Sequence, residues 1–236
     1  MTLPIRDRDR VFVLTGAGVS AESGLPTFRG ADGLWRGHRV EEVASPAAWQ
    51  RNPQMVWEFY SWRRDVHRTV RPNPGHLALA RLEERLGERM FLCTQNVDSL
   101  HERAGSKRVV HMHGRLLESR CDCCTRPPLE DTRSYTSLDD VPRCPCGGRW
   151  RPNIVWFGEV PMHLDEILAA IGRTTLFLAV GTSGAVYPAA SLAQAARQAG
   201  AHTFYIGPEE PLNRYAFDEC FLGKSGEVLP ELLDVG

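Results

Sequence analysis

The chain has 236 residues, a length that suits one large α/β domain with an excursion, or two modest domains. Its 28 lysines and arginines nearly balance 29 aspartates and glutamates, so the net charge of −1 gives no reason to expect a nucleic-acid partner. The N-terminus lacks an apolar signal-peptide core, and the longest apolar run, at 176–180, is far too short to cross a bilayer. We therefore expect a soluble, cytoplasmic protein without a membrane partner.

The first predicted element is a buried strand at 11–15. It leads into Gly16-Ala17-Gly18-Val19-Ser20-Ala21, which fits the G-x-G-x-x-G/A fingerprint of a dinucleotide-binding turn. A dehydrogenase would continue with an amphipathic helix, a second strand and an acidic residue for the ribose. Residues 24–33 instead contain four glycine or proline residues, a density that no passage from helix to strand tolerates. The turn indicates a dinucleotide, but its continuation disfavours hydride transfer.

A helix is predicted within 36–71, over the stretch PQMVWEFYSWRRDVHR. Its apolar face is formed by Val56, Phe59, Trp62 and Val66. Tyr60 and Arg63 lie three residues apart and can point the same way. Spacing alone favours a solvated helix edge for this arginine.

Five further apolar runs predict buried strands of a parallel sheet, at 90–94, 108–112, 153–157, 175–180 and 202–206. Helical spacing at 75–86, 163–171 and 189–199 predicts the crossover helices. The fold class is therefore α/β, with a Rossmann-like, doubly wound sheet formed by 1–35, 72–114 and 152–236. The interrupting segments 36–71 and 115–151 are expected to form a smaller module, helical and zinc-binding, with a cleft between it and the sheet.

Cysteines cluster in the second interrupting segment, where Cys121-x2-Cys124 precedes Cys144-x-Cys146 by nineteen residues. This spacing is typical of a four-thiolate zinc ribbon, although the second pair is one residue tighter than usual. Four protein ligands leave no open position, so we expect a structural Zn²⁺. Cys123 is an alternative ligand to Cys124. The clustering favours a reducing compartment over a disulfide framework.

Polar residues follow three of the predicted strands. Gln95, Asn96 and Asp98 come after one, His113 after another, and Gly181-Thr182-Ser183 after a third. Turn and capping chemistry would explain Asn96 or Asp98 taken alone. Because the carboxyl ends of parallel strands meet at one edge, a shared ligand site explains all three better. His113 lies at a strand exit, where it could act as a base, whereas His111 is expected to be structural.

Taken together, these motifs resemble the sirtuins, the family of NAD-dependent protein deacylases. The resemblance covers nearly the whole chain and rests on GAGVSAESGLPTFRG at 16–30, TQNVDSLHERAG at 94–105, HMHG at 111–114, the cysteine pairs, RPNIVWFGE at 151–159 and GTS at 181–183. It implies that NAD is consumed as a co-substrate, with nicotinamide and O-acyl-ADP-ribose as products. The shortened Cys144-x-Cys146 pair departs from the family pattern.

The resemblance also implies roles for individual residues. His113 and Asn96 are the expected catalytic residues, and acylated lysine side chains of proteins are the expected partners. The peptide would lie as an extended strand between Gly158-Glu159 and Val186-Tyr187, with Val155 nearby. The expected NAD-binding residues are Gly16, Ala17, Gly18, Ser20, Phe28, Arg29, Gln95, Asn96, Asp98, Gly181, Thr182, Ser183, Gly207 and Ser225.

The acyl group is suggested by Tyr60-x-x-Arg63, which resembles the pair that recognises the carboxylate of succinyl, malonyl or glutaryl lysine in class III sirtuins. Arg63 would pair with the carboxylate, and Tyr60 would donate a hydrogen bond. Ala44 stands where that class uses a small residue to widen the pocket. Arg64 is the alternative to Arg63 as the inward-facing arginine. Acetyl groups are small enough to enter the same pocket.

Three rival functions remain for the sequence. A hydride-transferring dehydrogenase is disfavoured because the expected second strand and its acidic residue are missing from the sequence. It would also leave the cysteine cluster unexplained. A non-catalytic NAD or ADP-ribose sensor is disfavoured by His113 beside Asn96 and Asp98. A protein ADP-ribosyltransferase would use the same activated sugar with another nucleophile.

Overall fold

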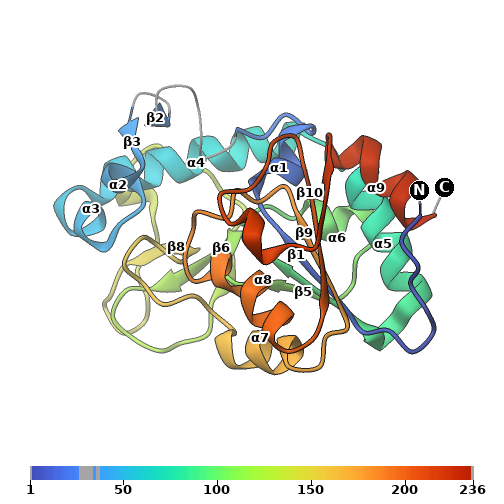
Figure 1. The fold of residues 1–236 in the computed structure, drawn as a ribbon. Coiled ribbons are helices and arrows are strands. Elements are labelled where there is room, and N and C mark those ends of the chain that lie inside the picture. The colour runs from blue at the N-terminus through green and yellow to red at the C-terminus, as the bar shows by residue number, and fades with distance from the viewer. Residues whose placement is uncertain (1, 27–33, 36–37, 235–236) are drawn as a thin grey trace.

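The computed structural model describes residues 2–26, 34–35 and 38–234 (Figure 1). Within them, no helix combines the length and the apolar character that crossing a membrane requires. The helices are α1 (Ala17–Ala21), α2 (Val40–Val43), α3 (Pro46–Arg51), α4 (Pro53–Thr69), α5 (Pro74–Leu86), α6 (Leu100–Ala104), α7 (Leu164–Ile171), α8 (Ala189–Gln198) and α9 (Ser225–Leu233). The strands are β1 (Val11–Thr15), β2 (Leu34–Trp35), β3 (His38–Arg39), β4 (Met90–Thr94), β5 (Val109–His111), β6 (Gly114–Cys121), β7 (Leu129–Glu130), β8 (Trp150–Ile154), β9 (Leu176–Val180), β10 (His202–Gly207) and β11 (Glu219–Leu222).

The main sheet has six parallel strands in the order β11-β10-β9-β1-β4-β5. Helices cover both of its faces, which is why β1, β4 and β9 are almost continuously apolar. Alternate residues of β1 enter different clusters: Val11 and Val13 pack with α5 and α9, and Phe12 and Leu14 pack with α7 and α8. The predicted α/β class with a parallel sheet is confirmed.

Two loops cross closely at the carboxyl edge of this sheet. The Gly18 N–H donates to the Gly181 carbonyl over 2.8 Å, joining the loop after β1 to the loop after β9. A Cβ added to Gly18 would lie 2.8 Å from the Gly181 backbone, and Gly181 itself has a φ of +61°. The predicted glycine turn therefore has a structural reason besides phosphate approach, because only glycine permits this crossing. As expected, α1 ends after one short turn, at Ala21.

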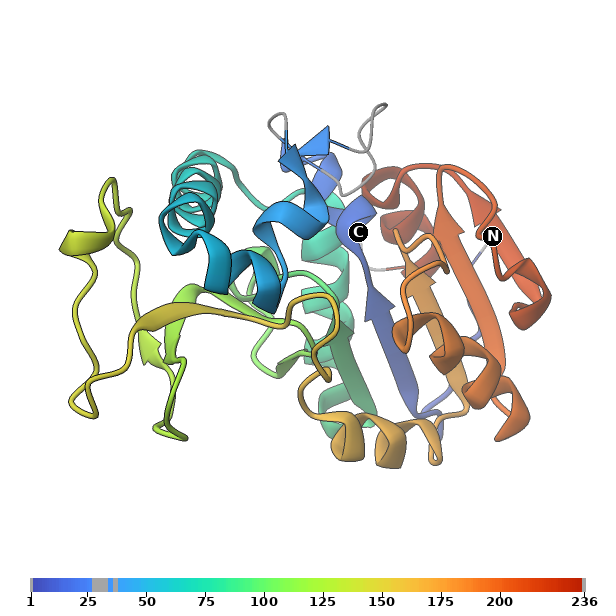
Figure 2. The same cartoon turned by 90° about the vertical axis from the view of Figure 1, so that its left-hand side faces the viewer.

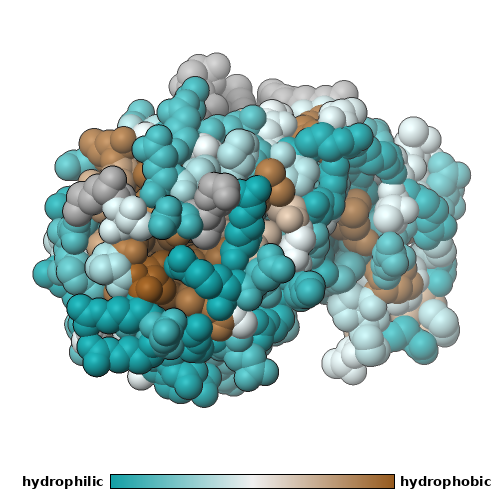
Figure 3. All heavy atoms as spheres, turned by 90° about the vertical axis from the view of Figure 1, so that its right-hand side faces the viewer, coloured by the Kyte–Doolittle hydropathy of each residue, from teal (hydrophilic) through white to brown (hydrophobic). Residues whose placement is uncertain are grey.

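The two inserted segments lie together beyond the β5 edge of the main sheet (Figure 2). They share a hydrophobic cluster that includes Val56 and Trp57 of α4, Leu116 of β6 and Trp150 of β8. At the other end of the molecule the Leu3 N–H donates to the Leu232 carbonyl, which holds the two chain ends together. Figure 3 faces the side of the molecule that is on the right in Figure 1, and shows a larger and a smaller lobe with a notch between them and a hydrophobic area on the larger lobe. The exact domain boundaries stay a prediction.

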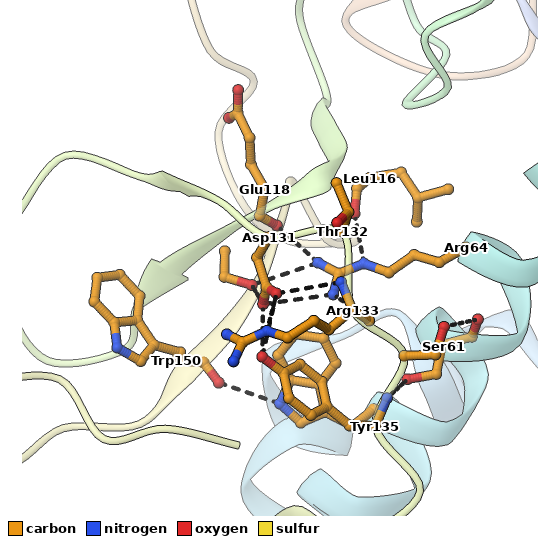
Figure 4. A network of polar contacts seen from close by, with 12 residues as sticks. Ser61, Arg64, Leu116, Glu118, Asp131, Thr132, Arg133, Tyr135 and Trp150 are labelled. Atoms are coloured by element: carbon orange, nitrogen blue, oxygen red, sulfur yellow. Dashed lines mark hydrogen bonds and ion pairs between the residues drawn. The ribbon is translucent and has the colours of Figure 1, made fainter. Parts of the chain in front are cut away.

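A fully buried arginine anchors α4 to the second inserted segment (Figure 4). Arg64 donates to the carbonyls of Leu116 and Arg133 over 2.9 and 2.6 Å, and lies 3.5 Å from a carboxylate oxygen of Asp131. Asp131 also accepts hydrogen bonds from Ser119, Arg133 and Tyr135. Burial alone would raise the pKa of Asp131, but the Ser119 hydrogen bond and the Arg64 charge hold it below its ordinary value.

One predicted strand of the main sheet is wrong. The run NIVWF at 153–157 was expected in the parallel sheet, but the strand is β8, shifted to Trp150–Ile154 and paired antiparallel with β6 in a separate sheet of order β7-β6-β8. All five residues of β8 are buried, but three of them are Arg151, Pro152 and Asn153, so the strand itself has no apolar run. The apolar residues Val155, Trp156 and Phe157 follow the strand, and Phe157 is 51% exposed, so the run located neither the strand nor its sheet.

Two C-terminal elements had no sequence prediction. The strand β11 is only partly buried and includes Glu219, so its composition is not that of a buried strand. The helix α9 contains Pro230, which is unfavourable inside a helix. Packing decides both cases: β11 adds to the edge of β10, and α9 buries Leu229, Leu232 and Leu233 against α5 and the sheet.

The buried arginine gives a stability prediction. Replacing Arg64 with Met removes the buried cation and leaves Asp131 with only the exposed Arg133, so we expect the free energy of unfolding to fall by about 3–5 kcal/mol. Arg68, one turn along α4, is the matched control. Its side chain is 47% exposed and pairs with Asp65, so Arg68→Met is expected to cost at most about 1 kcal/mol. Denaturant unfolding measures both, and equal losses would contradict the anchoring role of Arg64.

Candidate active site

A cavity of about 670 Å³ opens at the carboxyl edge of the main sheet, facing the inserted segments. It receives the loops that follow β1, β4, β5, β9 and β10, and one wall is provided by α4. The structure therefore brings the three predicted polar strand ends to one cavity. The predicted residues that line it are Gly16, Ala17, Gly18, Ala44, Tyr60, Arg63, Gln95, Asn96, His113, Val155, Gly158, Glu159, Gly181, Thr182, Ser183, Val186 and Tyr187.

Ser20 and Asp98 lie behind the lining and hold Asn96. The Asn96 side-chain amide donates to the Gly16 carbonyl over 3.0 Å and to the Ser20 hydroxyl over 3.2 Å. Ser20 in turn donates to Asp98, whose other oxygen accepts from the Leu100 N–H at the start of α6. The turn-capping role of Asp98 is therefore real, and it coexists with support of Asn96.

His113 presents a basic nitrogen to the cavity. Its Nδ1 lies 3.0 Å from the Gln95 carbonyl, and because a carbonyl can only accept, Nδ1 must carry the proton. The lone pair is then on Nε2. Burial lowers the pKa of His113 below its ordinary value of 6.5, and the hydrogen bond to Gln95 opposes this shift. The imidazole is therefore neutral and able to accept a proton at neutral pH.

His111, two residues earlier at the end of β5, has other partners. Its two nitrogens bond the Asn96 carbonyl over 2.9 Å and the Glu102 carboxylate over 2.8 Å. Both of its nitrogens have protein partners and the side chain is buried. The structural role expected for His111 agrees with these contacts.

Tyr60 and Arg63 stand together on the α4 wall, and Ala44 is a further lining residue. The Tyr60 hydroxyl accepts a hydrogen bond of 3.0 Å from the Trp156 indole. Burial raises the pKa of Tyr60 to about 12, so the phenol stays protonated at any physiological pH. The adjacent Arg64 turns into the inserted segment, as Figure 4 shows, which makes Arg63 the arginine of the cavity.

Two more of the predicted NAD-binding residues, Gly207 and Ser225, do not line the cavity. Gly207 ends β10, and its carbonyl accepts from the Gly223 N–H. Ser225 is buried at the start of α9, where its hydroxyl donates to Glu22. Phe28 and Arg29 lie outside the described residues.

Sequence reasoning missed several lining residues: Val97, Ile154, Trp156, Phe157, Pro161, Ala185, Tyr205 and Glu210. Trp156 and Phe157 stand inside the quoted motif RPNIVWFGE, but their assignment to a parallel strand suggested a sheet core. Tyr205 belongs to β10, where strand alternation alone does not single it out.

The four predicted cysteines come together at the far end of β6 and β8. The sulfurs of Cys121, Cys124, Cys144 and Cys146 lie within 4.8 Å of one another. Four sulfurs bound to one Zn²⁺ at about 2.3 Å stand about 3.8 Å apart, so the donor set fits a tetrahedral zinc ion. The Cys123 sulfur instead donates to Asp122 and is exposed, so Cys124 is the second cysteine of the cluster.

Glycines make room for the short second cysteine pair. A Cβ on Gly148 would lie 2.8 Å from the Cys121 sulfur, so a larger residue there would collide with the cluster. The backbone N–H groups of Gly148 and Cys123 donate to the Cys146 and Cys121 sulfurs over 3.4 and 3.3 Å. Such donors favour thiolates. Zinc bound here would supply structural cross-linking, because four cysteines leave no position for a substrate.

Comparisons with known proteins agree with this geometry. The Sir2 family model matches residues 16–188. An NAD-dependent protein deacylase of Salmonella typhimurium is 47% identical over 230 residues, covering 97% of this chain and 84% of the relative.

Solved structures agree as well. A crystal structure of a Sir2 homologue–NAD complex has a TM-score of 0.86 and 43% identity, covering 95% of this chain and 88% of the other. A structure of Sir2 bound to acetylated peptide has a TM-score of 0.82 and 29% identity, covering 95% and 92%.

Zinc content tests the cysteine cluster. We expect one zinc per chain by mass spectrometry of metals, lost in Cys124→Ser together with a large fall in melting temperature, because the ligand set would be incomplete. Cys123→Ser is the matched control and is expected to keep its zinc. If Cys124→Ser kept its zinc, or Cys123→Ser lost it, the zinc ligand would be Cys123 and not Cys124.

Proposed function

This chain belongs to the Sir2 family and is an NAD-dependent protein deacylase, and we propose that it removes succinyl and malonyl groups from lysine as well as acetyl groups. The observation that carries the acid-acyl preference is the pair of Tyr60 and Arg63 on one cavity wall. The products of the reaction are nicotinamide and O-acyl-ADP-ribose.

NAD, when bound, supplies a ribose carbon that loses nicotinamide as the acyl oxygen attacks it. Backbone groups of the two crossing loops, at 16–18 and 181–183, would hold the phosphates and the adenosine. Gln95, Asn96 and Asp98 would order the ribose and the carboxamide. The Gln95 amide already donates to the Thr182 hydroxyl over 3.0 Å, linking the two sides.

His113 is the proposed general base. Its Nε2 would accept a proton from a ribose hydroxyl, while Nδ1 keeps its hydrogen bond to the Gln95 carbonyl. That bond fixes both the tautomer and the ring orientation. Asn96, held by Gly16 and Ser20, is the proposed partner that orders the reacting ribose.

The peptide is proposed to lie between Gly158-Glu159 and Val186-Tyr187, with Val155 beside it. Three exposed apolar side chains flank this part of the chain: Phe157 is 51% exposed, Val160 76% and Tyr187 70%. Pairing through the peptide backbone would bring many sequences into the site, so broad protein substrates are expected. Deacylase relatives and a family structure with an acetylated peptide support acyl-lysine in proteins as the substrate.

The acyl pocket is proposed to read a carboxylate. The Arg63 guanidinium can form two hydrogen bonds to it, and Tyr60, protonated because of its raised pKa, can donate a third. Ala44 is buried, and its small side chain leaves room for a longer acyl chain. An acetyl group would use the same pocket without these contacts.

The rival functions differ in their products. A dehydrogenase would yield NADH, whereas a deacylase yields free nicotinamide and acyl-ADP-ribose. A sensor would yield neither, and an ADP-ribosyltransferase would label protein with ADP-ribose. The deacylase names of the relatives and the neutral His113 in the cavity favour deacylation over all three.

We further propose a cytoplasmic location, supported by five clustered thiols that need a reducing compartment. The net charge of −1 supports the absence of a nucleic-acid partner. The division into a Rossmann-like domain and a smaller module at 36–71 and 115–151 is likewise proposed.

Removing the base tests the mechanism. His113→Ala is expected to lower kcat by about 10²–10⁴-fold, while NAD binding measured by calorimetry changes little. Since burial holds the pKa of His113 below 6.5, the midpoint of the fall in wild-type kcat at low pH should lie below pH 6.5. A variant with the activity of wild type would remove His113 from the mechanism.

Removing the arginine tests the acyl preference. Arg63→Met should lower kcat/KM for a succinyl peptide by about 10- to 100-fold, the value of a charged hydrogen bond, and change acetyl turnover much less. Arg63→Lys keeps the charge but not the paired donors, and is expected to lie in between. The turnover of acetyl, succinyl, malonyl and glutaryl peptides by both variants is measured by mass spectrometry. Equal losses on acetyl and succinyl peptides would reject carboxylate recognition.

A further inference from the structure

A chain of polar contacts lies behind Tyr60 and ends at a pair of arginines. The Trp156 indole N–H donates to the Tyr60 hydroxyl over 3.0 Å, and the Trp156 backbone N–H donates to Glu159 over 2.8 Å. Trp156 is only 2% exposed. Its position is therefore fixed at both its backbone and its ring.

Glu159 is fully engaged within the protein, although it lies in the proposed peptide-binding stretch. Arg151 donates to its two oxygens over 2.8 and 2.9 Å, a bidentate pair, and Arg120 donates to both over 3.0 Å. The Arg151 guanidinium also lies 3.3 Å from the centre of the Trp156 ring. The ion pair thus holds a cation against the face of the indole.

These contacts decide what the Tyr60 hydroxyl can do. A phenol has one proton to donate and lone pairs to accept, whereas an indole N–H can only donate. Because Trp156 occupies an acceptor position of Tyr60, the Tyr60 proton is not used toward Trp156. That proton can point only to another acceptor, and Tyr60 lines the cavity together with Arg63.

We propose that Trp156, held by the Arg151–Glu159 ion pair, is a positioning residue that directs the Tyr60 hydroxyl as a donor toward a carboxylate-terminated acyl group. This role rests on the proposed acid-acyl preference of the site. Glu159 then serves mainly to hold Arg151 and Trp156, and its contribution to peptide binding comes from its backbone. Specificity for the acyl group then depends also on residues that do not touch the carboxylate, in addition to Arg63 and Tyr60.

A packing role alone would give different results. Trp156 also contacts the ring of Trp49, with ring centres 5.9 Å apart, so its bulk fills the wall of the cavity. Phenylalanine keeps most of that bulk and removes only the N–H donor. If Trp156 only packs, Trp156→Phe should change acetyl and succinyl turnover in parallel.

A double-mutant cycle separates the two roles. We measure kcat/KM for succinyl and acetyl versions of one peptide, at saturating NAD, for wild type, Trp156→Phe, Tyr60→Phe and the double variant. Trp156→Phe is expected to lower the succinyl-to-acetyl ratio by roughly three- to tenfold, the value of one hydrogen bond. In the Tyr60→Phe background the same change should leave the ratio unaltered, because the donor it orients is gone.

Trp57→Phe is the matched control. Trp57 is buried on the same helix as Tyr60 and donates to the Trp150 carbonyl, away from the cavity. Its substitution should lower the melting temperature but keep the ratio. Acetyl turnover by each preparation confirms that the NAD site is intact, and Arg151→Met, which frees the ring face of Trp156, should lower the ratio in the same direction as Trp156→Phe.

Failure of this positioning role and failure of the proposed acyl preference give different results. A wild-type enzyme without any preference for the succinyl peptide would overturn carboxylate recognition and this proposal with it. A wild-type preference that survives Trp156→Phe unchanged, or that falls equally in the presence and absence of the Tyr60 hydroxyl, would overturn the positioning role alone.

Discussion

The position of α4 depends on a guanidinium that has no contact with water. Arg64 bonds carbonyls of β6 and of the segment that follows β7, and faces the buried carboxylate of Asp131. A buried charge of this kind cannot move without losing its partners, so it fixes the rotation of the helix. Successive residues of a helix point about 100° apart, and with Arg64 turned into the module, Arg63 is turned to the cavity. Tyr60, one turn earlier, follows on the same wall.

The inserted segments therefore influence the acyl side of the cavity, although their cysteine cluster lies away from it. The four sulfurs hold the ends of β6 and β8, and these strands carry the partners of Arg64 and Trp57. Beyond β8, the chain continues to Trp156 and Glu159, which support Tyr60 from behind. In the proposed mechanism catalysis uses the other side of the cavity, where the glycine loops and His113 follow strands of the parallel sheet. One half of the site therefore serves the NAD chemistry shared by the family, and the other half serves the proposed choice of acyl group.

Sequence reasoning reached the parts of this arrangement that depend on local pattern. Signatures within a few residues mark the glycine turn, the polar strand ends, the cysteine spacing and the helix α4. The resemblance to a family then indicated that these features form one site. It failed where the answer depends on packing across the chain. The apolar run at 153–157 showed neither the bounds of β8 nor its sheet, and Arg64 stayed the alternative to Arg63 until the partners of Arg64 were seen. No local sequence pattern marks Trp156 as a residue that orients a hydroxyl. The role depends on contact with Tyr60, which is ninety-six positions away in the sequence.

The most direct measurement changes the substrate and leaves the protein intact. A peptide with succinyl-lysine is compared with one in which the terminal carboxylate is replaced by a carboxamide of the same shape, at saturating NAD. If Arg63 and Tyr60 read the negative charge, kcat/KM should favour the carboxylate by about tenfold to a hundredfold. Equal values for the two peptides would contradict carboxylate recognition by this wall of the cavity.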